Sequence, residues 1–434
     1  MTTTAAASPE TANDPSALTR WLETAPPALF ACYGGLMAFG AYFAMYAFRK
    51  PFTAASYAEV AGFVVDYKVA LVIAQVFGYA LSKIIGIRFV SELPGRWRAL
   101  AIVVLIAIAE AALIGFAVVP APWNIVCLFL NGLPLGVIWG LVFGFLEGRR
   151  TSEILGSILC ASFIVSSGIV KSVGSWLILQ NHATEFTMPA LTGLIFMPLL
   201  VLCVLGLTQL PAPNAADIAS RAKRAPMDAK ARNALFQAYA PGLIALIILY
   251  IMLTALRDFR DNFAAEIWSA VGMGEQAEIF SLTEIPIALL VLVMMAVLAV
   301  FRNNRNAIIA NLALIGAGLV VTAIASLLFW QQLIGPVTWM ILLGAGLYLS
   351  YTPFNGLLFD RLLAATGQVG TAGFLIYIAD SSGYLGSVAL LLFQNLSGLT
   401  LPWLDLMIGT SVVAGGVGLC LLFYASVYFY QRFS

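Results

Sequence analysis

The sequence has few charged residues and a single histidine, and both shortages exclude classes of protein. Only 10% of its 434 residues are Asp, Glu, Lys or Arg, and the formal net charge is +1. Soluble domains carry about 25% charged residues, so this composition excludes a water-soluble domain of this length. The near-zero net charge also argues against a nucleic-acid-binding protein.

Residues for metal, redox or catalytic chemistry are scarce as well. His182 is the one histidine, and the five cysteines stand singly in apolar stretches. Zinc sites and disulfide frameworks need several such residues at close spacing. The sequence also lacks a nucleophile with a base, an HExxH-type motif and a glycine-rich phosphate loop. We therefore expect no metal, no cofactor and no enzymatic activity.

Apolar sequence takes the place of these residues. Hydrophobic residues make up 61% of the chain and the mean hydropathy is +0.95. Apolar runs recur at the length of about 20 residues that a helix needs to cross a bilayer. The predicted fold class is all-α, a polytopic membrane protein with twelve transmembrane helices. The predicted spans are 29–50, 68–90, 98–118, 122–147, 153–180, 189–209, 240–260, 278–301, 307–330, 336–359, 370–395 and 403–430.

The spans divide into two groups of six. Residues 29–210 form the predicted N-terminal half and residues 240–434 the C-terminal half, joined by a polar cytoplasmic linker, 211–239. Residues 1–28 are expected to be a disordered cytoplasmic tail. With both termini in the cytoplasm, most of the 22 lysines and arginines fall on the cytoplasmic side, as the positive-inside rule requires.

The two halves repeat a short pattern of small residues. Residues 166–168 in the fifth span and 381–383 in the eleventh both read Ser-Ser-Gly. Small residues at matching positions let helices approach closely in both halves. Two pseudo-symmetric six-helix halves with a midplane site between them resemble the architecture of major-facilitator transporters.

Arginines in the first and seventh spans are candidates for binding an anion. Ionisable groups cost at least about 2.5 kcal/mol at the centre of a span, so each needs a reason. Tyr46 and Tyr42 precede Arg49 on one helix face, and a guanidinium beside phenols can hold an oxyanion. The alternative is that Arg49 reaches the outer headgroups. Arg257 occupies the equivalent part of the seventh span, where it either faces the cavity or pairs with Asp258 or Asp261.

Two lysines and two carboxylates complete the intramembrane set. Lys83 and Lys171 either add positive potential to a central cavity or pair with Glu284 or Asp380. Glu284 and Asp380 are candidate proton carriers, with a permanent ion pair as the alternative. Glu110 is expected to serve packing or tilt.

Charges of the inner loops are candidates for a gate. Glu147 and Arg149 lie between the fourth and fifth spans, and Asp360 and Arg361 lie at the matching place in the second half. Such pairs can latch an outward-facing state and release when the halves rock. The alternative is that they only set the topology.

Short motifs resemble the organophosphate:phosphate antiporter family of the major facilitators. Residues 46–52 (YAFRKPF), 77–83 (FGYALSK) and 383–387 (GYLGS) carry this resemblance. It implies that Arg49 and Arg257 bind phosphate, with Tyr42, Tyr46 and Lys83 lining the pore. It also favours a bacterial inner membrane and a monomer.

The sequence departs from this family at three positions. Val165 stands where the family has a phosphate-binding histidine, and neither Lys171 nor Asp380 has an obvious counterpart. The leading hypothesis is a secondary transporter of a small organic anion, in exchange for phosphate or with protons. A proton-coupled transporter of a drug, peptide or iron chelate is the second, and a transporter-like membrane sensor is the third.

Overall fold

The protein is a bundle of helices, seen here in a computed structural model. The structure describes residues 16–60, 64–147, 152–213, 229–301, 303–365, 373–397 and 401–433, and these ranges hold helices and no strand. All-helical structure is expected in a bilayer, because a helix satisfies its backbone hydrogen bonds internally.

The helices of the N-terminal half follow one another in chain order. They are α1 (Ala17–Thr24), α2 (Pro27–Tyr46), the 3-10 helix η1 (Pro51–Ala54), α3 (Tyr67–Glu92), the 3-10 helix η2 (Gly95–Trp97), α4 (Arg98–Val118), α5 (Ile125–Leu135), α6 (Ile138–Phe143), α7 (Ser152–Leu179) and α8 (Met188–Thr208).

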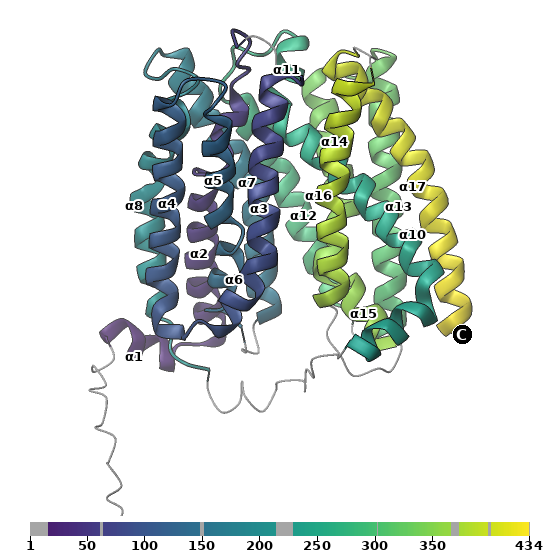
Figure 1. Cartoon of the computed structure of the whole chain (residues 1–434). Coiled ribbons are helices and arrows are strands. Elements are labelled where there is room, and N and C mark those ends of the chain that lie inside the picture. The colour runs from purple at the N-terminus through teal and green to yellow at the C-terminus, as the bar shows by residue number, and fades with distance from the viewer. Residues whose placement is uncertain are drawn as a thin grey trace, which may run out of the picture.

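The C-terminal half follows after residues that lie outside the described ranges. Its helices are α10 (Ala229–Asn262), α11 (Ala264–Ala270), α12 (Ile279–Ala299), α13 (Asn304–Trp330), α14 (Pro336–Gly356), α15 (Leu358–Ala365), α16 (Gly373–Leu396) and α17 (Trp403–Phe433). Figure 1 shows the two halves side by side, with α11 at one end and α1, α15 and the C-terminus at the other. We call these the α11 end and the α15 end.

Helices lie over all twelve predicted spans. Within the described residues, eleven stretches are long and apolar enough to cross a membrane. The exception is α16, which carries the polar run 380–384 in its first half. The all-α membrane fold is thus confirmed. The helix with the polar run, α16, packs on α3 of the other half.

Contacts between the halves follow a two-fold pattern. The second long helix of the N-terminal half, α3, packs on α16, and the second of the C-terminal half, α12, packs on α7. Each second span therefore contacts the fifth span of the other half. Gly168 makes the α7–α12 approach possible, because a Cβ there would lie 2.7 Å from the Phe280 carbonyl oxygen.

Three boundary predictions were wrong. Residues 17–24 of the expected disordered tail form α1, which Ser16 caps by accepting from the Thr19 N–H. The last part of the expected linker 211–239 is helical, because α10 begins at Ala229. The fourth span, predicted as 122–147, is broken into α5 and α6 after Pro134 and Gly136, since proline removes a helical hydrogen bond.

Candidate functional site

Arg49 is presented by the N-terminal half just beyond the end of α2. Its guanidinium carbon lies 3.8 Å from the ring centroid of Tyr79 and 5.7 Å from that of Tyr46. Its Nε is buried without a hydrogen-bond partner, and none of the ion pairs found in the described residues includes it. Arginine has five donors and no acceptor, so this one is free to bind an anion.

The predicted tyrosines of the first span lie where expected, with one addition. Tyr42 and Tyr46 are both buried, and their rings meet edge to face with centroids 5.6 Å apart. The nearest ring to Arg49 nevertheless belongs to Tyr79 on α3, which the sequence did not single out. Spacing along one helix predicts partners on that helix only.

Arg257 is the corresponding cation of the C-terminal half. It lies on α10 with its guanidinium carbon 4.0 Å from the Tyr351 ring centroid. Its terminal nitrogen also makes an ion pair of 2.6 Å with Asp258. Of the sequence alternatives, the pair with Asp258 is present, and Arg257 also stacks on an aromatic ring. Each half thus provides one arginine seated on a tyrosine.

Lys83 and Asp380 join the two halves near these arginines. The lysine Nζ lies 2.7 Å from an Asp380 carboxylate oxygen, and it also donates to the Tyr384 hydroxyl at 3.2 Å. The Tyr250 hydroxyl donates to the other Asp380 oxygen. The lysine and aspartate side chains are 28% and 20% exposed, so this ion pair can be reached by a solute.

Asp261 binds lysines, whereas the sequence analysis named it only as a possible partner of Arg257. One of its carboxylate oxygens lies 2.6 Å from the Lys171 Nζ, and the other lies 2.5 Å from the Lys50 Nζ. The Ser167 hydroxyl donates to it as well, and Lys50 also donates to Asn262. A single carboxylate of α10 therefore holds two lysines of the N-terminal half.

Lys171 is placed differently from its prediction. The sequence offered Glu284 or Asp380 as its partner, but its partner is Asp261 and its side chain is 1% exposed. Glu284 is paired instead with Arg260 at 2.6 Å, within the C-terminal half. Lys171 is thus part of the contact between the halves, and its ammonium is fully engaged there.

A further lysine pair lies at the α11 end. The Lys68 Nζ is 2.6 Å from a Glu266 carboxylate oxygen and donates also to the Thr53 carbonyl. Burial raises the pKa of Glu266, and Lys68 opposes that rise. In each of the four ion pairs that the described residues form between the halves, the lysine belongs to the N-terminal half and the carboxylate to the C-terminal half.

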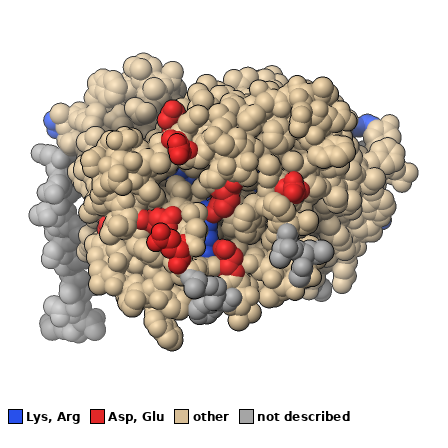
Figure 2. Space-filling view, turned by 90° about the horizontal axis from the view of Figure 1, so that it is seen from above, with Lys and Arg blue, Asp and Glu red and all other residues tan. Residues whose placement is uncertain are grey.

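The surface of the α11 end is acidic. Figure 2 views the molecule from this end and shows carboxylates gathered near the middle, with basic residues only partly visible between them. Carboxylates in the segments that connect helices at this end include Glu59, Asp66, Glu185, Glu266, Glu275 and Glu278. The lysines of this region are buried beneath them, Lys50 at 7% and Lys68 at 1% exposure.

The predicted inner gate is only partly visible. Arg149 lies outside the described residues, and Glu147 is exposed at the α15 end. Arg361 on α15 donates to the Asn304 side chain at 3.0 Å, a partner in the same half. Asp360 lies on α15 beside it. The Arg361 contact is thus internal to one half, unlike the lysine pairs nearer the α11 end.

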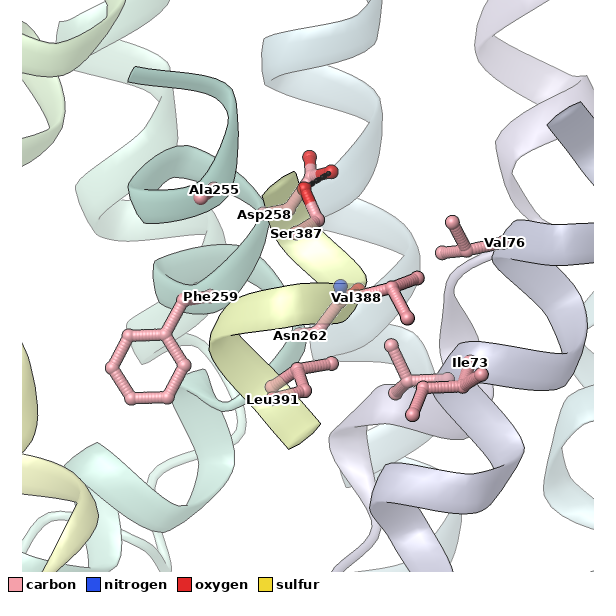
Figure 3. A pocket seen from close by; sticks show the side chains of 10 residues that line it. Ile73, Val76, Ala255, Asp258, Phe259, Asn262, Ser387, Val388 and Leu391 are labelled. Carbon is pink, nitrogen blue, oxygen red and sulfur yellow. Dashed lines mark hydrogen bonds between the residues drawn. The ribbon is translucent and has the colours of Figure 1, made fainter. Parts of the chain in front are cut away.

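A small pocket lies between the halves, nearer to the α11 end than Lys83 is. Figure 3 shows it bounded by α3 on one side and by α10 and α16 on the other. Its one carboxylate is Asp258, which accepts from Ser387 at 2.8 Å as well as from Arg257. The other lining residues are Val72, Ile73, Val76, Ala255, Phe259, Asn262, Val388 and Leu391.

Solved structures with the same fold are transporters. The chain is similar to a POT family transporter in complex with a thioalcohol-conjugated peptide (TM-score 0.61, 13% identity, 94% of this chain and 97% of that chain). It is also similar to a D-xylose-proton symporter (TM-score 0.59, 12% identity, 91% and 96%). A third is a variant of the peptide transporter POT in complex with sulfate (TM-score 0.59, 15% identity, 94% and 95%).

These identities are low, so they show the fold alone, which is that of the major facilitators. The curated proteins contain no match to this chain. A family profile, however, matches residues 51–432, which is most of the sequence. The chain therefore belongs to the family described as "Family of unknown function (DUF5690)".

Proposed function

We propose that the protein is a secondary active transporter that moves a small organic anion across the membrane by alternating access. The observation that carries this proposal is Arg49, a half-buried cation on an aromatic ring, with a buried Nε and no anionic partner among the described residues. An unpaired guanidinium inside a membrane is costly, and a bound anion would offset that cost. Phosphorylated compounds are the favoured substrates, because a guanidinium matches phosphate with two parallel hydrogen bonds.

Arg257 would hold the same anion from the other half. It stacks on the Tyr351 ring, and Asp258 satisfies part of its charge. Transport sites of this fold lie between the two halves. An anion held by one arginine of each half would draw the halves together, which couples binding to the change of access.

Lys83 and Asp380 would exchange partners during transport. In the present conformation the Asp380 carboxylate occupies the lysine as an internal counter-ion. An arriving anion would take over Lys83, leaving Asp380 with its one tyrosine donor, Tyr250, and free to accept a proton. The coupling is then exchange for phosphate or symport with protons.

The membrane orientation follows from the charges of the two ends. Arginines gather at the α15 end, at Arg20, Arg98, Arg305, Arg361 and Arg432. The opposite face is acidic (Figure 2). The positive-inside rule then places the α15 end and both termini in the cytoplasm, as in a bacterial inner membrane. Among the described residues, four ion pairs join the halves, three of them toward the α11 end. With this orientation, these pairs would close the outer side in the present conformation.

The test is phosphate exchange in proteoliposomes. Vesicles loaded with inorganic phosphate should take up labelled phosphate from outside when they hold the wild-type protein. Arg49→Ala and Arg257→Ala should each lower the rate at least tenfold, since one charge-assisted hydrogen-bond pair is worth about 1.5–3 kcal/mol. The control is Arg305→Ala, an exposed arginine at the start of α13. Normal exchange by Arg257→Ala would contradict the two-arginine site.

A second candidate is a proton-coupled transporter of another metabolite, such as a peptide. The observation that favours it is Asp380, a carboxylate inside the bundle that pairs with a lysine of the other half. Uptake of labelled dipeptides that follows a proton gradient and ignores phosphate would favour this candidate over the first.

A further inference from the structure

Glu110 is a buried carboxyl group that the proposed transport mechanism does not use. It lies on α4, thirteenth of the 21 residues from Arg98 to Val118, and it is 5% exposed. At a rise of about 1.5 Å per residue, this position is close to the middle of the helix. Neither carboxyl oxygen has a hydrogen-bond partner among the described residues.

The surroundings of Glu110 are apolar and close. A Cβ added to Gly193 on α8 would lie 2.4 Å from Glu110 Oε2 and 2.9 Å from the Phe48 ring. The carboxyl group therefore fits in the space that a glycine leaves, beside an aromatic ring. Only a residue without a side chain at position 193 admits it.

None of the ion pairs found among the described residues includes the Glu110 carboxyl group. The helices packed on α4 are chiefly α5, α8 and α6. Their titratable side chains are Cys127, whose thiol lies against Gly115, and Cys203, whose thiol lies against Gly40. Asn131 on α5, a buried polar side chain of these helices, donates to the Ala109 and Phe48 carbonyls and accepts from Gln75.

A carboxylate cannot remain ionised in such a place. Burying an isolated charge costs far more than protonating it, so the group takes up a proton instead. A permanently neutral side chain at this position would pack at lower cost as Leu or Met. The presence of a carboxyl group is explained if it becomes ionised in another conformation of the protein.

The network around Glu110 reaches Arg49. Asn131 holds the carbonyl of Phe48, and Gln75 donates to the carbonyl of Arg49 at 2.9 Å and to Asn131 at 2.8 Å. Phe48, whose ring lies beside the Glu110 carboxyl group, is the residue before Arg49. Any change at Glu110 that moves Phe48 also moves the start of the segment that presents the arginine.

We propose that Glu110 is a proton-binding site: it is a neutral carboxylic acid in the present conformation and releases its proton to water when the N-terminal half rearranges. Ionisation would repack Phe48 and thereby shift Arg49. The role in coupling rests on the proposed function and deepens it by naming the proton as the coupling ion. The protonated state itself does not depend on any substrate.

The first measurement therefore needs no substrate. Infrared difference spectra of the purified protein between neutral and alkaline pH should show loss of a protonated carboxyl C=O band. Glu110→Gln should lack this component, Glu110→Asp should retain it at a shifted frequency, and Glu278→Gln, an exposed control at the start of α12, should leave it unchanged. A well-folded Glu110→Gln protein with the wild-type band would overturn the proposal.

The second measurement separates coupling from binding. In proteoliposomes, an imposed pH gradient should drive accumulation of labelled inorganic phosphate by the wild type. Glu110→Gln should keep phosphate exchange at equal pH. Its gradient-driven accumulation of phosphate should be at least tenfold lower than that of the wild type. Equal accumulation by both proteins would overturn the coupling role. A wild type that exchanges no phosphate, but shows the infrared band, would count against the proposed anion and leave the proton site standing.

Discussion

Asp380 of α16 lies 2.7 Å from Lys83 of α3, so a carboxylate of one half neutralises a lysine of the other half. The two residues are 297 positions apart in the sequence. The tyrosine hydroxyls of Tyr250 and Tyr384 complete the arrangement. An internal carboxylate thus occupies the kind of position that an anionic substrate would need.

Removing that carboxylate charge should strengthen anion binding. In Asp380→Asn the lysine no longer has a competing counter-ion, so we expect the KM for phosphate to fall about three- to tenfold, on the order of 1 kcal/mol. Exchange kinetics in proteoliposomes measure it. Asp405→Asn, an exposed aspartate at the start of α17, is the matched control. An unchanged or higher KM in Asp380→Asn would contradict the competition.

Asp261 should hold the outer side closed. Asp261→Asn leaves the ammonium groups of Lys50 and Lys171 without their carboxylate, and breaking a buried pair from one side costs about 3–5 kcal/mol. We expect the protein to shift toward an outward-open conformation. A cysteine introduced by Val72→Cys, in a background without native cysteines, lines the pocket between the halves and reports this opening.

The expected result is a rate of labelling at that cysteine, by a membrane-impermeant thiol reagent from outside, at least tenfold higher in Asp261→Asn. A shift of about 1.4 kcal/mol in the equilibrium between the two conformations changes it tenfold, so the loss of the buried ion pairs is large enough for this effect. Asp66→Asn, an exposed aspartate at the same end, is the control. Equal labelling rates with and without the Asp261 substitution would show that other contacts keep the outer side closed.

The close packing of α3 on α5 should depend on Gly132. A Cβ there would lie 2.3 Å from the Gln75 carbonyl oxygen and 2.9 Å from the Tyr79 nitrogen, both backbone atoms. Gly132→Ala should therefore lower the free energy of unfolding by about 1–3 kcal/mol or more, the cost of overpacking. Thermal unfolding in detergent measures it. Gly416→Ala, where no atom lies within 4 Å of the new Cβ, should be neutral or stabilising.

Glu266 should make stability depend on pH. Because burial raises the pKa of Glu266, the folded state binds its proton more tightly than the unfolded chain does. Its contribution to stability is therefore complete below the ordinary glutamate pKa of about 4.3 and is lost as pH rises through the raised value. Glu266→Gln, which does not titrate, should lack this decline. Thermal unfolding followed from acidic to neutral pH tests it, with the exposed Glu275→Gln as control.

Sequence alone determined the fold class and most helix positions. The span predicted at 98–118 is α4 to the residue, and the spans at 153–180 and 189–209 are α7 and α8 within one residue. Long apolar runs suffice for this, because a bilayer leaves a chain few structures other than helices. The sequence also predicted tyrosines beside Arg49 and an acidic neighbour as one alternative for Arg257, and both contacts are present, although the role of the two arginines in binding stays a prediction.

Only the tertiary structure decided which charges meet. Lys171 pairs with Asp261, 90 positions away, and not with either carboxylate that its sequence suggested. The ring that contacts Arg49 most closely belongs to Tyr79, and the Glu110 carboxyl group has no hydrogen-bond partner among the described residues. Hydropathy and helical spacing act over one span, whereas these partners come from different helices whose rotation and depth are set by packing. The sequence therefore determined which side chains enter the membrane, and the packing of the two halves determined which of them remained unpaired.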